Sequence, residues 1–186
     1  MRFASLILTR CFGYPYTKDN GASLGAPLID HLVGTYENPS RSTVAQAYDF
    51  IIETLEEAVT LMSEEKNNGR MNKYAARALL ARVYLYHNDN RKAFDMAEQL
   101  IKDVDASGSY ALYPHEKYVA AWSVETKFGS ESFFEIANSV DDTPGRDSWG
   151  YLLNWYGYQK GFVTQKYAER MLADPGRCAW AVAGGE

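Results

Sequence analysis

Residues 72–104, NKYAARALLARVYLYHNDNRKAFDMAEQLIKDV, contain two runs whose apolar side chains recur with the spacing of one helical face. The members of the first run are Ala75, Ala76, Leu79, Leu80, Val83 and Tyr84, and those of the second are Ala93, Phe94, Ala97, Leu100 and Ile101. Residues 87–90, HNDN, supply a short polar turn, in which Asn90 is placed to cap the second helix. The stretch therefore predicts an antiparallel helical hairpin.

The small residues of this hairpin allow its two backbones to approach closely, and larger ones fill the remaining space. The small residues are Ala76, Ala81, Ala93 and Ala97, and the larger ones are Leu80, Tyr84 and Leu100. The pattern is similar to one tetratricopeptide unit, which has about 34 residues. Because Ala78, Leu85 and Tyr86 make the other side of the first helix apolar as well, we expect neighbouring helices or a partner to cover it.

A further helix is predicted over residues 43–62. Thr43 and Gln46 have the spacing of a capping box. The apolar stripe that follows is Val44, Ala47, Tyr48, Ile51, Ile52, Leu55, Ala58, Val59 and Met62. The acidic residues of this region are Glu53, Glu56, Glu57, Glu64 and Glu65. We interpret them as a solvated face rather than as a general acid–base pair. A turn at residues 67–69, NNG, is expected to end the helix.

Two segments precede this helix. Residues 1–12 predict a short apolar helix. Residues 12–41 are rich in Gly, Pro, Asn, Ser and Tyr and show neither helical nor strand periodicity, which predicts a long ordered loop. Its tyrosines, Tyr14, Tyr16 and Tyr36, are suited either to ligand recognition or to packing of the loop.

Shorter elements follow residue 104. We expect an extended piece at residues 110–114, a brief helix with Tyr118 and Trp122 one turn apart, and a strand-like segment at residues 132–136. Residues 140–161 are irregular. Thr164 is placed to cap a last helix, which residues 174–176 end and which contains Tyr167, Ala168, Met171 and Leu172.

Composition excludes several classes of function. The chain has 186 residues and a net charge of −5, so no basic surface is expected to bind nucleic acid or an anionic membrane. No run approaches the roughly 20 apolar residues of a membrane span. Residues 8–11, LTRC, bear a faint likeness to a lipoprotein cleavage site, but the apolar run before them is short and Arg10 is unsuited to that site. Cys11 and Cys178 are interpreted as unpaired thiols.

The candidate ligand site is an aromatic cluster in the irregular segment. Its residues are Trp149, Tyr151, Asn154, Trp155, Tyr156 and Tyr158. Sugar rings pack their C–H faces on Trp and Tyr, while their hydroxyls need planar polar partners such as Asn. The alternative is that these rings only fill space under a long loop.

Catalytic and cofactor chemistry finds little support. The histidines, His31, His87 and His115, have no metal-ligand spacing, no Gly-rich phosphate loop is present, and no nucleophile has a recognisable base. We therefore expect no metal, no cofactor and no enzyme activity. Two carboxylate pairs, Glu131 with Glu135 and Asp141 with Asp142, leave a glycoside hydrolase as a distant alternative.

Three motifs, in this order, resemble the SusD/RagB family of nutrient-binding outer-membrane lipoproteins from Bacteroidetes. Residues 41–51 resemble its R-S-x-V-x-x-x-Y-x-x-I entry, residues 76–86 its A-R-x-L-L-A-R-V-Y-L-Y run, and residues 131–136 its E-S-x-F-E-I segment. The resemblance implies a mostly α fold of tetratricopeptide-like hairpins, an alpha-alpha superhelix with long irregular loops and little strand. It also implies capture of glycans or other nutrients at the cell surface, for delivery to a SusC-like TonB-dependent transporter.

The sequence departs from the family in length and in lacking the signal peptide with its lipidated cysteine, the anchor that holds the family to the outer membrane. We therefore expect a fragment, with residues 1–186 as one SusD-like domain fragment. Within it, residues 42–104 form the helical core, and residues 105–175 form an aromatic-rich part of the ligand-binding half. The alternative function is a helical-repeat scaffold that binds another protein.

Overall fold

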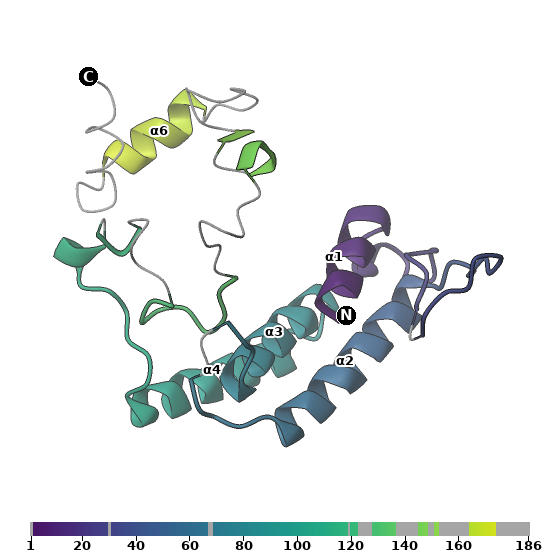
Figure 1. Ribbon diagram of the computed structural model, residues 1–186, viewed down its shortest axis with the longest axis horizontal. Helices are drawn as coiled ribbons and strands as arrows, with labels where there is room; N and C mark the ends of the chain where they lie inside the picture. Colours follow the sequence, from purple (N-terminus) through teal and green to yellow (C-terminus); the bar gives the residue numbers. More distant parts are fainter. Residues whose placement is uncertain are drawn as a thin grey trace. The chain divides into compact units, whose positions relative to one another are not determined.

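The computed structural model describes residues 2–29, 31–66, 69–118, 120–122, 128–136, 145–148, 151–152 and 164–173. The chain divides into two compact units, Met1–Ser109 and Tyr110–Glu186. The first unit contains α1 (Arg2–Phe12), η1 (Tyr16–Lys18), α2 (Val44–Leu61), α3 (Lys73–Tyr86) and α4 (Asn90–Ser107), drawn in Figure 1. The predicted helices of this unit are confirmed.

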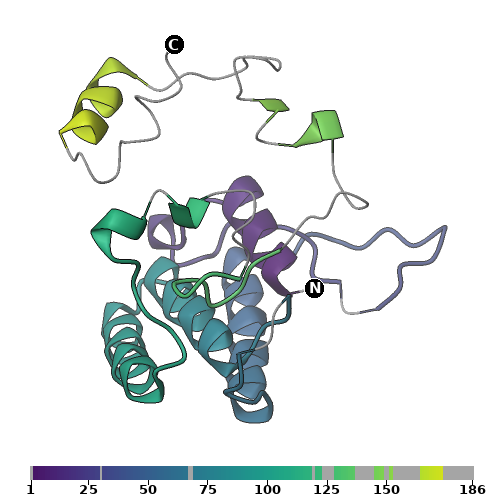
Figure 2. The same ribbon diagram turned by 60° about the vertical axis from the view of Figure 1, so that its left-hand side comes forward.

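Helix α3 lies between α2 and α4, as Figures 1 and 2 both show. Helix α1 packs against α2 and inserts Leu6, which is 1% exposed. The core that results consists of Leu6, Val44, Tyr48, Ile51, Leu55, Leu79, Leu80, Val83, Tyr84 and Ala93. Neighbouring helices of the chain thus cover α3 from more than one direction, but Leu85, on the side predicted to be covered, remains 54% exposed.

Side chains cap the starts of the three long helices. The capping box of α2 is confirmed: Gln46 N donates to Thr43 Oγ1 at 3.1 Å, and Thr43 N donates to Gln46 Oε1 at 2.9 Å. In α4, however, Asp89 and not Asn90 is the N-cap, accepting from Lys92 N at 3.2 Å. The reason is Asn88, whose φ of 71° turns the chain one residue earlier than predicted.

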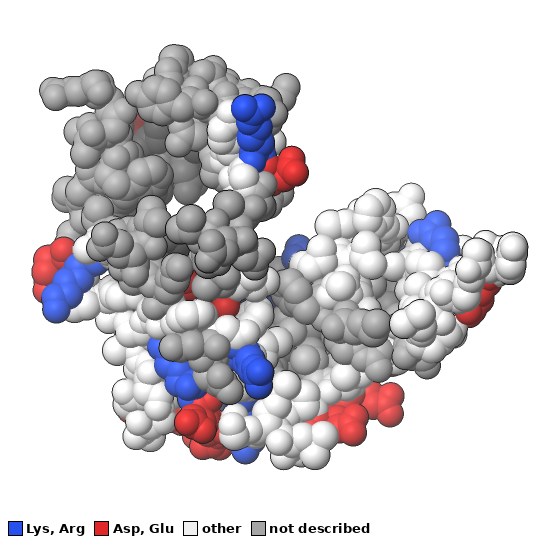
Figure 3. Space-filling model, viewed as in Figure 1, with Lys and Arg blue, Asp and Glu red and all other residues white. Residues whose placement is uncertain are grey.

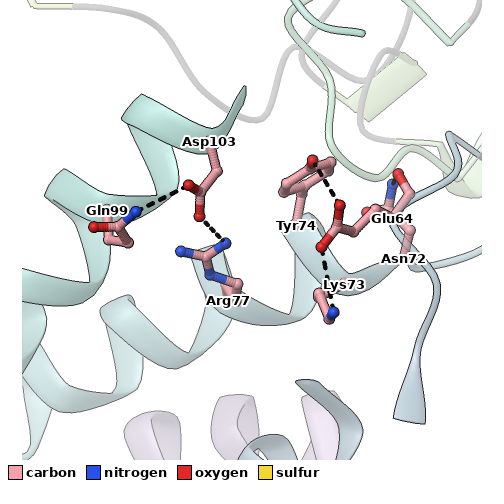
Figure 4. A network of polar contacts seen from close by, with 7 residues as sticks. All are labelled: Glu64, Asn72, Lys73, Tyr74, Arg77, Gln99 and Asp103. Atoms are coloured by element: carbon pink, nitrogen blue, oxygen red, sulfur yellow. Dashed lines mark hydrogen bonds and ion pairs between the residues drawn. The ribbon is translucent and has the colours of Figure 1, made fainter. Parts of the chain in front are cut away.

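Helix α2 ends at Leu61, before the predicted turn at residues 67–69, of which 67 and 68 lie outside the described residues. Glu64 and Glu65 therefore lie beyond the end of α2 rather than on it, although both are exposed to solvent as predicted. Residues at the start of α3 contact them. Asn72 Nδ2 donates to Glu65 O at 3.2 Å. The Glu64 carboxylate accepts from Lys73 and from the Tyr74 hydroxyl, each at 3.3 Å (Figure 4).

Polar contacts also fasten the helices to one another. Arg77 on α3 is 9% exposed and reaches Asp103 on α4, which also accepts from Gln99 (Figure 4). The Arg77 hydrogen bond is the main reason that the pKa of Asp103 lies below its ordinary value. On the other side of α3, the Tyr84 hydroxyl donates to Glu56 on α2. Burial first, and then this hydrogen bond, raises the pKa of Tyr84.

The second apolar run is only half buried. Ala93, Leu100 and Val104 of α4 are buried, whereas Phe94 and Ile101 are each 61% exposed. The prediction that Phe94 and Ile101 share the buried face is wrong for this unit. Only α3 makes an extensive contact with α4, so one side of the apolar run remains without a neighbouring helix in the part of the chain that the structure describes.

The second unit contains η2 (His115–Lys117), η3 (Ala120–Trp122), η4 (Gly145–Asp147) and α6 (Gln165–Leu172). Two 3-10 turns, η2 and η3, stand where the sequence predicts one brief helix. Residues 132–136 form a bend within irregular backbone rather than a strand, which corrects that prediction. Thr164 caps α6 as predicted, accepting from Tyr167 N at 3.3 Å. Among the described residues, no helix is long and apolar enough to cross a membrane.

The segment at residues 132–136 is held by side chains and not by strand pairing. The ring of Phe133 packs edge-on against that of Tyr110, with the ring centres 4.9 Å apart. Just before this segment, Ala111 N donates to Ser130 O at 3.2 Å. Alternating bulky residues predict a strand only if a partner strand lies beside them, and here an aromatic contact takes that place.

Candidate functional site

The predicted aromatic cluster falls mostly outside the described residues. Trp149, Asn154, Trp155, Tyr156 and Tyr158 all do. Tyr151 is described: it is half-buried, and its N donates to Ser148 Oγ at 3.1 Å. Ser148 thereby begins a short helical turn at Tyr151. The ligand-binding role of the cluster remains a prediction.

The tyrosines of the loop at residues 12–41 have different surroundings. Tyr16 is half-buried between α2 and the end of α3, with its ring centre 5.7 Å from that of Tyr48 and 4.2 Å from that of His87. Tyr14 is 57% exposed and lies under the Lys18 ammonium, whereas Tyr36 is 96% exposed. Packing therefore accounts for Tyr16, and the loop presents Tyr14 and Tyr36 to solvent.

The loop also completes the start of α2. Val44 N donates to Ser23 O and Ala45 N to Gly21 O, both at 2.9 Å, while Gln46 N is held by the Thr43 side chain. Gly21 suits this place because its φ is 75° and an added Cβ would lie 2.7 Å from Ala45 N. Because these N–H groups are all satisfied within the protein, the start of α2 offers no anion site.

Arg41 joins the two ends of the loop. Its Nε donates to Gly25 O at 2.7 Å, and its Nη2 donates to Leu24 O at 3.0 Å and to Phe12 O at 3.3 Å. Backbone pairing beside Arg41 supports this contact. Gly25 N donates to Ser42 O at 2.7 Å, and Leu24 and Thr43 form an isolated antiparallel β-bridge. Sequence reasoning missed this role, although Arg41 begins one of the motifs that carry the family resemblance.

A pocket of about 460 Å³ opens beside Arg41 in the first unit. Its walls are formed by Leu8, Phe12, Gly25, Ala26, Pro27 and Arg41. Most of this lining is apolar, and Phe12 and Leu8 are 68% and 44% exposed. An open, largely apolar hollow with one cationic side chain has the composition of a small-molecule binding site.

The carboxylates considered for glycoside hydrolysis have structural partners. Glu131 Oε1 accepts from Tyr113 N at 2.5 Å, and Glu135 Oε2 accepts from Phe128 N at 2.9 Å. Tyr113 also contacts this segment through its side chain, since its hydroxyl accepts from Ser130 N at 3.2 Å. These carboxylates close the turns around residues 128–136. Asp141 and Asp142 lie outside the described residues.

Metal and charge complete the description of the surface. No group of three or more His, Cys, Asp or Glu side chains is placed to hold a metal ion in the described part of the chain. Figure 3 shows basic and acidic side chains scattered in small groups over the face in view.

The sequence and the fold both match known proteins. A family model of SusD-like proteins, described as starch-binding and associating with the outer membrane, matches residues 3–85. A SusD superfamily protein from Bacteroides vulgatus is 91% identical, with a TM-score of 0.87 over 94% of this chain and 39% of that one. A search of curated proteins finds no match.

Two further crystal structures agree. A protein from Bacteroides vulgatus described as sugar binding is 41% identical, with a TM-score of 0.84 over 94% of this chain and 39% of that one. A SusD superfamily protein from Bacteroides thetaiotaomicron is 40% identical, with a TM-score of 0.70 over 77% of this chain and 30% of that one. The chain thus spans about two fifths or less of the length of these relatives.

Proposed function

Because this chain belongs to the SusD superfamily, we propose that it takes part in capturing glycans or other nutrients at the bacterial cell surface, without altering them chemically. The observation that carries the proposal is the match of residues 3–85 to a family described as starch-binding. Delivery to a SusC-like TonB-dependent transporter and residence at the outer membrane are part of the same proposal.

The arrangement of the chain supports separate roles for its scaffold and its ligand-binding part. The helices of the first unit bury their apolar faces on one another, which suits residues 42–104 to a scaffold. We infer that residues 105–175 contribute to the ligand-binding half. The non-catalytic part of the proposal is supported by Glu131 and Glu135, because each carboxylate already accepts a backbone N–H group. A general acid or base needs its carboxylate turned toward the substrate.

A glycan array probed with the 186-residue chain tests this proposal, together with turnover assays on the oligosaccharides that bind. We expect binding and recovery of the oligosaccharides intact. Hydrolysis of a bound oligosaccharide would contradict the non-catalytic role. An array without any binding would contradict the glycan ligand.

The second candidate is a protein-binding scaffold, which the exposed pair Phe94 and Ile101 on α4 favours. These side chains lie two helical turns apart on one side of α4, a spacing that suits contact with another helix. Phe94→Ser together with Ile101→Ser distinguishes the candidates when both sugar and protein binding are measured. A glycan binder keeps its affinity for sugar, whereas a protein-binding scaffold binds no sugar before or after the change and loses its protein partner.

A further inference from the structure

Arg41 is a cation without an acidic partner in the described part of the chain. Guanidinium carries five N–H donors. Three hydrogen bonds to backbone oxygens occupy Nε and Nη2, and Nη1 donates to no group among the described residues. The ion pairs of these residues do not include Arg41. The positive charge is therefore fixed in place, and no carboxylate of the described residues pairs with it.

The three backbone contacts make Arg41 a preorganised donor. A free arginine loses rotamer freedom when it binds a ligand, and this loss weakens the affinity. Here the protein has already fixed the side chain between Phe12, Leu24 and Gly25. A carboxylate that approaches Nη1 gains charge-assisted hydrogen bonds, which are about twice as strong as neutral ones.

The rest of the pocket is apolar and aromatic. The Phe12 ring is 68% exposed and shares the lining with Leu8 and Pro27. A volume of about 460 Å³ lies within the range of about 300–1,000 Å³ that is usual for small-molecule sites. An aromatic ring beside a fixed cation matches a ligand with an apolar face and a negative group at its edge.

We propose that this pocket, lined by Phe12 and Arg41, is a subsite for an acidic sugar residue such as a uronic acid. The C–H face of the sugar packs on Phe12, and its carboxylate accepts from Arg41 Nη1. This inference rests on the proposed glycan-binding function but concerns residues other than the aromatic cluster at residues 149–158. It assigns the ligand class through charge complementarity, since a neutral sugar can accept a hydrogen bond from Arg41 but supplies no negative charge to balance it.

The test is to measure the affinity of the 186-residue chain for trigalacturonate and for the neutral maltotriose by isothermal titration calorimetry. Phe12→Ala should weaken trigalacturonate binding by about 5- to 30-fold, the loss usual for an interface aromatic. Phe12→Leu, which keeps the apolar packing but removes the ring, should weaken it as well. Tyr36→Ala is the matched control, because Tyr36 is an exposed aromatic of the same loop that does not line the pocket.

Salt and charge supply a second readout. Raising the ionic strength from about 0.1 M to about 1 M shortens the Debye length from about 10 Å to about 3 Å, so the affinity for trigalacturonate should fall. Arg41→Lys keeps the charge but loses the fork that grips three carbonyls, and it should also weaken trigalacturonate binding.

Three outcomes would overturn the inference: no binding of trigalacturonate, an unchanged affinity in both Phe12 variants, or an equal loss for maltotriose. A fall in melting temperature of Phe12→Ala with unchanged affinity per folded molecule would instead assign the pocket to packing. If trigalacturonate does not bind while neutral glycans do, only this inference fails. If no glycan of either kind binds, the proposed function fails with it.

Discussion

Arg77 Nη1 on α3 lies 2.6 Å from Asp103 Oδ2 on α4, an ion pair that joins the two helices of the hairpin. The arginine side chain is 11% exposed and the aspartate side chain 38%. Gln99 supports the aspartate from one turn away, donating at 2.9 Å. The pair therefore combines a buried cation with a partly solvated anion, and it fixes how the two helices are aligned along their length.

Asp103→Asn is expected to reduce the pH dependence of the free energy of unfolding at acidic pH. The folded-state pKa of Asp103 lies below its ordinary value of 3.8, so the ion pair stabilises the fold above about pH 4 and this contribution is lost as pH falls through the lower pKa. Urea titrations at pH 7 should find the variant less stable than wild type, and at about pH 2 the difference should vanish. The control is Asp95→Asn in the exposed Arg91–Asp95 pair, which should change little. A difference that is the same at both pH values would refute the role of the pair.

Thr9→Val is expected to stabilise the protein by about 1–2 kcal/mol. Thr9 is 2% exposed, and its hydroxyl has no hydrogen-bond partner among the described residues. Valine has nearly the same shape and removes the unpaired polar group.

Thr43→Val is the matched control for this substitution. Its hydroxyl caps α2, so the same chemical change should destabilise the protein by about 1 kcal/mol. Thermal unfolding of both variants measures the two effects. Destabilisation by Thr9→Val would mean that its hydroxyl does find a partner.

Leu80→Ala should destabilise the protein by about 2–5 kcal/mol, as expected for a large-to-small change in a packed core. Leu80 is 1% exposed where α3 meets its neighbours, whereas Leu85 on the same helix is 54% exposed. Leu85→Ala should therefore cost much less. Denaturant titration measures both, and a loss below about 1 kcal/mol for Leu80→Ala would contradict the packing of the hairpin.

Trp149→Ala and Trp155→Ala should each weaken carbohydrate binding by about 1–3 kcal/mol and leave the melting temperature nearly unchanged. The reason is that rings without helical or strand periodicity are not committed to a core. Glycan titration together with thermal unfolding measures both effects. If both variants unfold while affinity per folded molecule is unaltered, the rings are structural, and the search for a site passes to the loop at residues 12–41.

The sequence by itself determined the helical scaffold. Helix formation is signalled by residues close together in the sequence, namely the recurrence of apolar residues and caps such as Thr43 with Gln46. These signals do not depend on distant residues. The same holds for the hairpin at residues 72–104 and for the cap at Thr164. The errors at Asn90 and at the end of α2 are small, because helix ends depend on turns and side chains just beyond the periodic pattern.

Only the tertiary structure decided what those helices contact. The period of α4 does not say that Phe94 remains exposed while Ala93 is buried, because that depends on which neighbours are present. Likewise, residues 132–136 have the composition of a strand, but Phe133 packs against the Tyr110 ring and no partner strand lies beside them among the described residues. Arg41 grips carbonyls as far away as Phe12, 29 residues earlier in the chain. Such long-range contacts leave no period in the sequence, and for that reason the pocket beside Arg41 could be found only in the folded chain.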